Sequence, residues 1–428
     1  MRILVHTIFY RPELTGVAKY TAEMCEWLTA RGHEVEVVCP PPYYPHWRIQ
    51  AGYGQWSYQR EFLNGVRVTR CPIWLPAHPG GIRRILYALS FMISSFPVML
   101  GKLLRRPDVV LVLEPSFLNA LPSLLVAKLG GALAWLQIKD YEIDIAFNLG
   151  QLKRPWLRCT LLKMESWLMR RFDVVSTISR SMQAKAISKG VRAEHLVLFP
   201  DWVDTNVICP VSGPSPLRAE LGIRDNQVVV LFSGTLNAKQ GIETVIAAAA
   251  ELSKDPAADN ILFLICGNGP AAVKLKALAA SLPNVRFLGL QPAERLNELL
   301  NTADIHVLPQ VREVAESVLP SKLLGMLASG RPIVATVGPA SEVGHYVSGG
   351  GILTTPGNAQ ELAVAVRNLA ADQQLRNNLG LKARENAERS LRHDVILTAF
   401  EQELETRLPR EAVSRDLTRH ANSGVRSI

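Results

Sequence analysis

The sequence lacks paired cysteine motifs, and its first residues do not show the pattern of a signal sequence. Its six cysteines lie far apart, and none belongs to a Cys-x-x-Cys pair. This spacing argues against a zinc ribbon or a disulfide framework and suits a reducing compartment, where we expect them to act as small buried hydrophobic residues. The beginning of the chain has no basic segment followed by a hydrophobic core, so we expect a protein that is not exported.

The length and the hydrophobic content predict two domains. With 428 residues and 48% hydrophobic residues, the chain is too long for one ordinary core and long enough for two. The net charge of +9 is unevenly distributed: residues 1–205 hold 25 Lys and Arg against 16 Asp and Glu, whereas residues 206–428 hold 22 of each. The basic excess therefore belongs to the first half alone.

Short apolar runs rich in Val, Ile and Leu alternate with longer segments of helical period. This alternation is typical of parallel sheets that are covered on both faces. The predicted strands are residues 3–5, 34–38, 66–70, 109–113, 134–138, 174–178 and 196–199 in the first half, and 228–232, 261–266, 285–288, 305–308, 333–335 and 351–353 in the second. We therefore predict an α/β protein of two doubly wound Rossmann-like domains that face each other across a cleft.

The domain boundary is predicted near residues 205–226, where several prolines and a glycine interrupt any regular element. This divides the chain into a first domain of residues 1–205 and a second of residues 206–408. We expect the final helical stretch, residues 395–408, to cross back to the first domain. The polar, basic residues 409–428 are predicted to be disordered.

The stretch Glu-Ser-Val-Leu-Pro-Ser-Lys at residues 316–322 opens a predicted helix over residues 323–329. A helix start carries unpaired backbone N–H groups and the positive end of the helix dipole. Ser321 and Lys322 at this position predict a site for a phosphate or diphosphate. Such a site indicates a nucleotide-activated substrate.

Further motifs follow in a fixed order along nearly the whole chain. They are Tyr-Arg-Pro-Glu-Leu-Thr-Gly-Val-Ala-Lys-Tyr at residues 10–20, Phe-Pro-Asp-Trp-Val-Asp at 199–204, Ser-Gly-Thr-Leu-Asn-Ala-Lys-Gln-Gly at 233–241, Cys-Gly-Asn-Gly-Pro at 266–270, Ala-Asp at 303–304 and Ser-Gly-Arg-Pro at 329–332. Each alone is weak evidence, but the ordered set resembles the retaining glycosyltransferases of family 4. The forms Pro-Asp-Trp-Val-Asp and Leu-Pro-Ser-Lys are most similar to the branch that builds bacterial exopolysaccharides of the colanic-acid type.

The resemblance implies an enzyme of the GT-B fold that moves a sugar from a nucleoside diphosphate to an acceptor and retains the anomeric configuration. As the glycosidic bond breaks, negative charge develops on the diphosphate, and Lys322, Ser321 and the N–H groups of the following helix would stabilise it. No metal or other cofactor is then required, and the sequence has no tight Asp-x-Asp pair or His cluster to bind a metal. The acceptor implied for this branch is a polyprenyl-diphosphate-linked glycan.

Glu316 is the candidate for holding the donor sugar, because a carboxylate accepts hydrogen bonds from neighbouring sugar hydroxyls. The alternative is an ordinary charge at a helix start. Gly16 lies in the first strand-to-helix loop, where a missing side chain lets the backbone approach a ligand, unless the glycine serves only the turn. Further donor-binding candidates are Gly234, Thr235, Lys239, Gln240, Gly267, Asn268, Gly269, Ser317 and Ser321.

Two departures from the family pattern affect these candidates. The family often has two glutamates eight positions apart, but the residue eight positions after Glu316 is Leu324. A register taken from the later glycine places Ser317 and Gly325 at the two acidic positions, so one carboxylate is missing in either case.

The Arg and Lys that commonly follow the first strand of the second domain are replaced by Thr235 and Gln240. Lys239 would contribute a cation only if the loop shifted by one residue. Neutralisation of the phosphate is therefore expected to depend more heavily on the lysine at the helix start.

On the acceptor side, many relatives have a His after a strand where this chain reads Gln-Ile-Lys-Asp-Tyr-Glu-Ile-Asp at residues 137–144. Asp140 or Lys139 could occupy its place. Asp140 is the candidate for orienting the acceptor or accepting its proton, although the departing diphosphate oxygen can also take the proton. The alternative is a charged loop after a buried strand.

Two stretches of the first half predict contact with a membrane. Residues 85–101 contain no charged side chain, have basic residues on both sides, and are interrupted by Pro97, which favours an interfacial or partly buried helix over a spanning one. Residues 153–171 add Trp156 and Trp167 among six basic residues. We expect this half to dock on the anionic inner face of the cell membrane, as a cytoplasmic peripheral protein. The alternative is a core helix with solvated ends, and the long apolar runs argue against nucleic acid as the partner.

Two other functions share the predicted fold. The missing carboxylate and the residues Thr235 and Gln240 would also suit a nucleotide-sugar-binding regulatory or scaffold protein without turnover. A nucleotide-sugar epimerase would change the donor without any acceptor.

Overall fold

The computed structural model describes residues 1–13, 16–76, 82–113, 117–141, 143–144, 155–312 and 319–408. The chain forms two compact units. Unit 1 consists of Met1–Pro200 together with the chain from Leu397 onward, and unit 2 consists of Asp201–Ile396. The final helix α16 (His393–Arg407) thus begins in unit 2 and continues in unit 1, as the sequence predicted.

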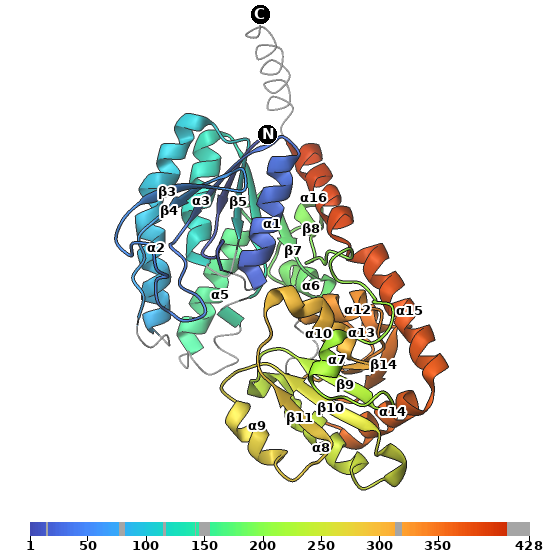
Figure 1. The fold of residues 1–428 in the computed structure, drawn as a ribbon. Helices are drawn as coiled ribbons and strands as arrows, with labels where there is room; N and C mark the ends of the chain where they lie inside the picture. The colour runs from blue at the N-terminus through green and yellow to red at the C-terminus, as the bar shows by residue number, and fades with distance from the viewer. Residues whose placement is uncertain are drawn as a thin grey trace, which may run out of the picture. The chain divides into compact units, whose positions relative to one another are not determined.

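Unit 1 contains one eight-stranded sheet (Figure 1). Its strands are β1 (Arg2–His6), β2 (Glu34–Cys39), β3 (Gln59–Leu63), β4 (Val66–Arg70), β5 (Val109–Leu113), β6 (Leu133–Ile138), β7 (Val174–Thr177) and β8 (Leu196–Leu198). Their order is β3-β4-β2-β1-β5-β6-β7-β8, and neighbours are parallel except for the antiparallel pair β3 and β4. The apolar runs of the sequence predicted these strands except for β3, which lies at the edge.

Helices cover both faces of this sheet. They are α1 (Gly16–Ala30), α2 (Ile82–Gly101) with the short helix η1 (Lys102–Arg105), α3 (Phe117–Gly130), α5 (Pro155–Met169), α6 (Arg180–Ser188), η2 (Ala193–His195) and α16. The buried His6 of β1 bonds to Ser95 of α2 and Ser123 of α3, which places these two helices on one face. On the other face, Trp135 of β6 packs edge-on against Phe400 of α16.

Unit 2 contains a six-stranded sheet that is parallel throughout. Its strands are β9 (Val228–Ser233), β10 (Ile261–Cys266), β11 (Val285–Leu288), β12 (Ile305–Leu308), β13 (Ile333–Thr336) and β14 (Gly351–Thr354). The order β11-β10-β9-β12-β13-β14 is that of a Rossmann fold, which places ligands at the carboxyl ends of its strands.

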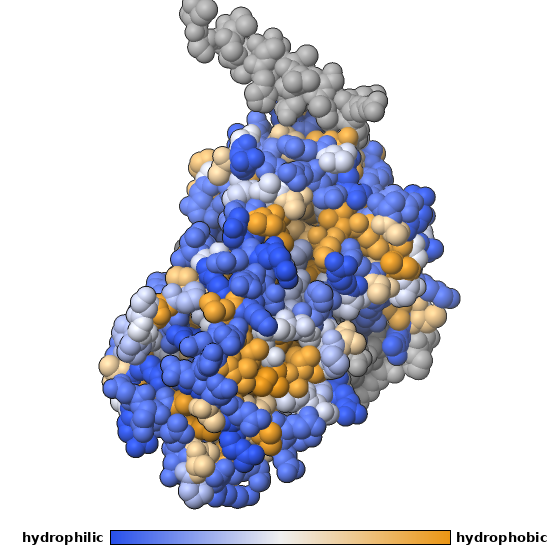
Figure 2. All heavy atoms as spheres, turned by 90° about the vertical axis from the view of Figure 1, so that its right-hand side faces the viewer, coloured by the Kyte–Doolittle hydropathy of each residue, from blue (hydrophilic) through white to orange (hydrophobic). Residues whose placement is uncertain are grey.

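The helices of unit 2 connect these strands in the expected alternation. They are α7 (Pro216–Glu220), η3 (Ala238–Gln240), α8 (Ile242–Leu252), η4 (Pro256–Ala258), α9 (Ala272–Leu278), η5 (Ala293–Arg295), α10 (Leu296–Thr302), α12 (Lys322–Ala328), α13 (Glu342–Val347), α14 (Ala359–Ala371) and α15 (Gln373–Ser390). The side of the molecule that carries α15 and α16 is mainly hydrophilic, with separate apolar patches (Figure 2). Two doubly wound α/β domains are therefore confirmed.

The missed strand β3 has a physical explanation. An edge strand is buried on one side only, and Gln59–Leu63 carries Arg60 and Glu61 instead of a continuous apolar run. The dipeptide that links β3 to β4 was the available signal. Asn64 and Gly65 have φ angles of 49° and 85°, the left-handed conformation that a two-residue hairpin turn requires.

Candidate functional site

The side chain of Lys322 is the centre of the candidate site in unit 2. Lys322 is the first residue of α12, and its Nζ atom lies 2.5 Å from Oε1 of Gln240 and 4.2 Å from the ring centroid of Phe232. Gln240 ends η3, and Phe232 belongs to β9. Because this environment removes water from the ammonium group, the pKa of Lys322 falls from 10.5 to about 7.

Gly234 lies next to the side chain of Lys322. Gly234 follows β9 with a φ of 147°. A Cβ atom at this position would lie 3.4 Å from Cδ and 3.6 Å from Nζ of Lys322. These are ordinary van der Waals distances, so an alanine here would touch the lysine without displacing it, while the φ of Gly234 is one that residues with a side chain rarely adopt.

Gly267 and Gly269 bring two loops together. Their Cβ atoms would lie 1.9 Å from the carbonyl oxygen of Gly234 and 2.3 Å from that of Leu236. The backbone N–H of Leu236 also donates to the carbonyl oxygen of Asn268, at 2.9 Å. The loops that follow β9 and β10 thus pack backbone against backbone, which no residue with a side chain would permit.

A cavity of about 230 Å³ lies at the carboxyl ends of β10 and β11. Its lining residues are Gly267, Asn268, Ala272, Lys276, Phe287, Leu288, Gly289 and Leu290. Of these residues, Gly267 and Asn268 were predicted from the sequence, and the others were not. The end of the predicted strand at residues 285–288, followed at once by Gly289, was the signal that could have identified them.

The remaining predicted residues of unit 2 are more exposed. Thr235, Lys239 and Ser321 are exposed, and Ser321 makes no side-chain capping bond to α12. The structure therefore brings Gln240, and not Lys239, into contact with Lys322. The ring of Phe232 is a part of this environment that the sequence analysis did not identify.

Several predictions fall on residues outside the described ranges. Glu316 and Ser317 lie within residues 313–318, which the structure does not describe. The same holds for residues 145–154 and for the predicted tail at residues 409–428. Their assigned roles stay predictions.

Unit 1 holds the candidates for the acceptor side. It also holds Gly16, predicted to bind the donor, which begins α1 with a φ of 36° and has no atom of the described residues within 4 Å of where its Cβ would lie. Asp140 is exposed just after β6. The neighbouring Lys139 is buried, with Nζ 5.3 Å from the ring centroid of Tyr20 in α1 and 5.8 Å from that of Phe199.

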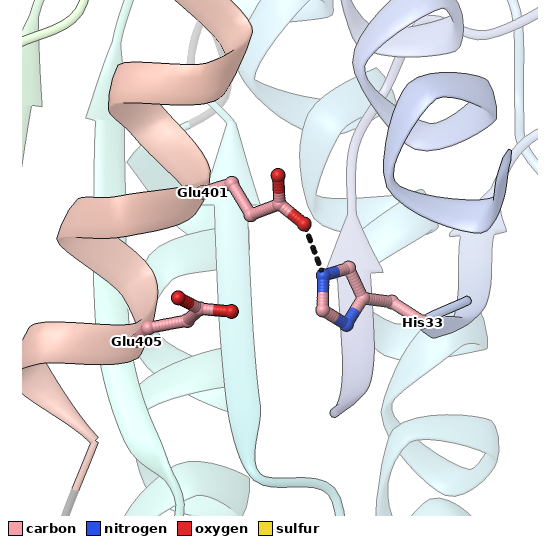
Figure 3. Close-up of side chains that lie close together, drawn as sticks. All are labelled: His33, Glu401 and Glu405. Carbon is pink, nitrogen blue, oxygen red and sulfur yellow. Dashed lines mark hydrogen bonds and ion pairs between the residues drawn. The ribbon is translucent and has the colours of Figure 1, made fainter. Parts of the chain in front are cut away.

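His33, Glu401 and Glu405 form a cluster of potential metal ligands, drawn in Figure 3. Nε2 of His33 lies 2.9 Å from Oε1 of Glu401, and Nε of Arg31 lies 3.1 Å from Oε2 of Glu401. A guanidinium group already neutralises this carboxylate. We therefore interpret the cluster as a contact that holds α16 against the loop before β2. It includes none of the predicted site residues.

Two family models match successive parts of the chain. A glycosyl transferase 4-like domain matches residues 15–202, and glycosyl transferases group 1 matches residues 215–386. A protein of Escherichia coli (strain K12) that carries the name colanic acid biosynthesis glycosyl transferase WcaI is 40% identical over 337 residues, which cover 77% of this chain and 82% of that protein.

Solved structures of low sequence identity share the fold. Sucrose-phosphate synthase from Thermosynechococcus elongatus aligns with a TM-score of 0.74 at 18% identity, over 95% of this chain and 98% of that chain. HepE of Anabaena, solved in complex with UDP-glucose, aligns with a TM-score of 0.68 at 18% identity, over 95% of this chain and 100% of that chain. The two Rossmann-like units, the matched domains and the relative in E. coli together show that this chain is a glycosyltransferase of family 4, with the GT-B fold, in the bacterial exopolysaccharide branch.

Proposed function

We propose that the protein transfers a sugar from a nucleoside diphosphate sugar to a polyprenyl-diphosphate-linked glycan in exopolysaccharide biosynthesis, with retention of the anomeric configuration. The observation that carries this proposal is the enclosed ammonium group of Lys322 beside Gly234, at the carboxyl end of β9. A cation with a pKa lowered by burial gains strongly from an incoming anion, because the anion replaces the lost solvation. The names of the relatives support the proposal: WcaI is named for colanic acid biosynthesis, and HepE was solved with UDP-glucose.

Lys322 would stabilise the leaving diphosphate. One N–H group of the Lys322 ammonium donates a hydrogen bond to Oε1 of Gln240, which leaves two N–H groups for phosphate oxygens. Gln240 would therefore orient the ammonium group toward the donor. Because the lysine supplies positive charge where negative charge develops, we propose catalysis without a metal ion.

The cavity at β10 and β11 would hold the nucleoside part of the donor. Phe287 and Leu288 provide apolar surface for a heterocycle, and Asn268 and Lys276 provide polar groups that can fix its orientation. Gly267 belongs both to this cavity and to the backbone contact with the Gly234 loop. A nucleotide spanning the two loops would thus reach from the cavity to Lys322.

The acceptor would meet residues of unit 1. The exposed Asp140 would orient the acceptor hydroxyl, and Gly16 would let the phosphate or sugar of the donor approach the backbone. Glu316 would hold the donor sugar. We propose that this reaction takes place at the cytoplasmic face of the membrane, where a lipid-linked acceptor is found.

Nucleotide binding followed by transfer tests the proposal. Purified protein is screened for thermal stabilisation by UDP-, GDP- and dTDP-sugars, because a ligand that binds the native state raises the unfolding temperature. Release of the free nucleoside diphosphate is then measured with and without a membrane extract that contains lipid-linked glycans. Release that depends on the extract supports transfer. Binding without release would favour a regulatory protein, and a changed donor without extract would favour an epimerase.

A further inference from the structure

Helix α2 is buried on one side and apolar on its exposed side. Tyr87, Phe91, Ser95 and Met99 recur every four residues and are buried. The segment Arg83–Arg105 is long and apolar enough to cross a membrane by length and composition alone. The buried stripe, which includes the bond between Oγ of Ser95 and Nε2 of His6 at 3.0 Å, holds it on the sheet instead.

The exposed sides of α2 and α3 form an apolar surface. On α2, Leu86 is 45% exposed and Ile93 is 61% exposed. On α3, Leu121, Leu125 and Leu129 are exposed by 52%, 44% and 62% and follow one another at a spacing of four residues, so they form one ridge. Because His6 bonds to both helices, α2 and α3 lie on the same face of the sheet, as Figure 1 shows.

A row of aromatic side chains extends this surface at the edge of the sheet. Trp56, Tyr58 and Phe62 are exposed by 67%, 54% and 69%. Tyr58 and Phe62 share one side of the β3 segment because side chains alternate along a strand. The hydroxyl of Tyr58 donates to the carbonyl oxygen of Ser94 in α2, at 2.9 Å, so the aromatic row is continuous with the helix. We call the exposed sides of α2 and α3 with these three aromatic residues the α2–α3 face.

Basic residues surround the α2–α3 face, and acidic ones are scarce. The sequence of α2, η1 and α3 contains no Asp or Glu. The basic residues of these elements and of the residue after η1 are Arg83, Arg84, Lys102, Arg105, Arg106 and Lys128. Glu36 pairs with Lys102 and Arg105, and Asp173 pairs with Lys128, so two of these six positive charges are offset by acidic residues of neighbouring elements. In α5, the one acidic residue, Glu165, is buried and bonded to Lys189. After α5, the guanidinium of Arg171 lies 4.1 Å from the ring centroid of Trp167, which is exposed.

We propose that the α2–α3 face docks unit 1 on an anionic phospholipid bilayer, a partner whose relevance rests on the lipid-linked acceptor of the proposed function. The leucine ridge enters the boundary between headgroups and acyl chains, Trp56 and Tyr58 lie at the headgroup level, and the basic residues contact lipid phosphates. Charge favours a bilayer over a second copy of this chain as the partner of the α2–α3 face. Two basic faces repel each other, whereas anionic headgroups attract them.

Co-sedimentation with vesicles tests the docking. The wild-type protein is expected to bind vesicles of phosphatidylcholine and phosphatidylglycerol in equal parts, to bind pure phosphatidylcholine more weakly, and to dissociate at high salt. The variant Leu121→Ser/Leu125→Ser/Leu129→Ser is expected to lose at least about tenfold in affinity, because its ridge no longer transfers apolar area from water. The variant Arg83→Gln is expected to lose about fivefold on the anionic vesicles alone.

The matched control is Val364→Ser/Leu381→Ser, which removes apolar side chains of unit 2 that are 41% and 64% exposed. It is expected to bind vesicles like the wild type. A second readout is tryptophan fluorescence. Lipids brominated near the headgroup should quench the fluorescence of the wild-type protein, and Trp56→Phe should reduce that quenching. The proposal is overturned if the wild type stays in the supernatant at low salt, or if the ridge variant binds as well as the control.

Nucleotide binding separates this proposal from the proposed function. The ridge variant is expected to keep the thermal shift with GDP or UDP that the wild type shows, since its substitutions lie on the surface of unit 1. Vesicle binding without any nucleotide shift would refute the donor site and leave the docking intact. Nucleotide binding without vesicle binding would refute the docking and leave the donor site intact. A ridge-dependent dimer in light scattering, with no vesicle binding, would show that the face joins two copies instead.

Discussion

Nζ of Lys322 lies 2.5 Å from Oε1 of Gln240, although 82 residues separate the two along the chain. The contact joins the start of α12 to the end of η3, and a Cβ atom at Gly234 would lie 3.6 Å from the same Nζ atom. Gln240 accepts a hydrogen bond from the lysine and adds no charge. The positive charge of this contact therefore belongs to Lys322.

Replacing Lys322 is expected to abolish most of the transfer activity. Lys322→Ala should lower the rate of nucleoside diphosphate release by about a hundredfold or more, the scale for loss of one preorganised donor to the transition state. Lys254→Ala is the matched control, because Lys254 is an exposed lysine of unit 2 that pairs with Glu251. A folded Lys322→Ala variant with unchanged turnover would contradict the placement of the diphosphate.

Replacing Gly234 with alanine is expected to weaken nucleotide binding more than it lowers the free energy of unfolding. In Gly234→Ala, the new methyl group would contact Lys322 at the distances given above and occupy space needed by the diphosphate. Gly357→Ala controls for backbone strain, because Gly357 has a φ of 80° and free space around it. Both variants should lose about 1 kcal/mol of unfolding free energy. Only Gly234→Ala should raise the Kd for the nucleoside diphosphate, measured by calorimetry.

The lowered pKa of Lys322 predicts pH-dependent binding and stability. In the unliganded fold the pKa is about 7, and in the unfolded chain it is near 10.5. Between these values the unfolded state binds more protons, so the stability of unit 2 should rise with pH, and Lys322→Met should remove that rise. A bound diphosphate favours the ammonium form, so its affinity should fall as pH rises above about 7, by at most about tenfold per pH unit. Equal affinity across this range would show that the ammonium group does not contact the ligand.

Removal of divalent metal ions is expected to leave transfer unchanged. Lys322 provides the positive charge that a metal would otherwise bring to the diphosphate. The rate of nucleoside diphosphate release is compared before and after treatment with EDTA and again after adding Mg²⁺ or Mn²⁺. A loss with EDTA that the added metal restores would contradict the metal-independent mechanism.

Two buried histidines are expected to make both units sensitive to acid. His6 of β1 and His306 of β12 are completely buried, and burial lowers the pKa of each from 6.5 to about 3. Below pH 6.5 these two imidazoles become protonated in the unfolded chain but stay neutral in the folded protein. Each should therefore remove about 1.4 kcal/mol of stability per pH unit down to about pH 3. Thermal unfolding of His6→Gln and His306→Gln against pH measures this slope, and an unchanged slope would contradict it.

The central strands could be predicted from the sequence because they are buried on both faces. Residues 109–113 and 261–266 belong to central strands that are buried on both faces, so their sequences are apolar throughout and predicted β5 and β10. The edge strand β3 lacks that constraint, and its signal was the turn at Asn64 and Gly65. The positions of Lys322 and Gly234 followed from motifs. The contact of Lys322 with Gln240, however, depends on a turn that no local pattern specified.

The sequence by itself determined the order of the apolar strands and of the helices between them, the family, and the glycines that follow β9 and β10, because each depends on local spacing or on a missing side chain. The tertiary structure decided which loop residue reaches Lys322, since η3 ends at Gly241 with a φ of 65° and so turns Gln240, and not Lys239, toward α12. It also decided that the apolar run of α2 is buried along one stripe only and is otherwise partly or fully exposed. The sheet beneath α2 covers only one side of the helix, and composition along the chain cannot tell the two sides apart.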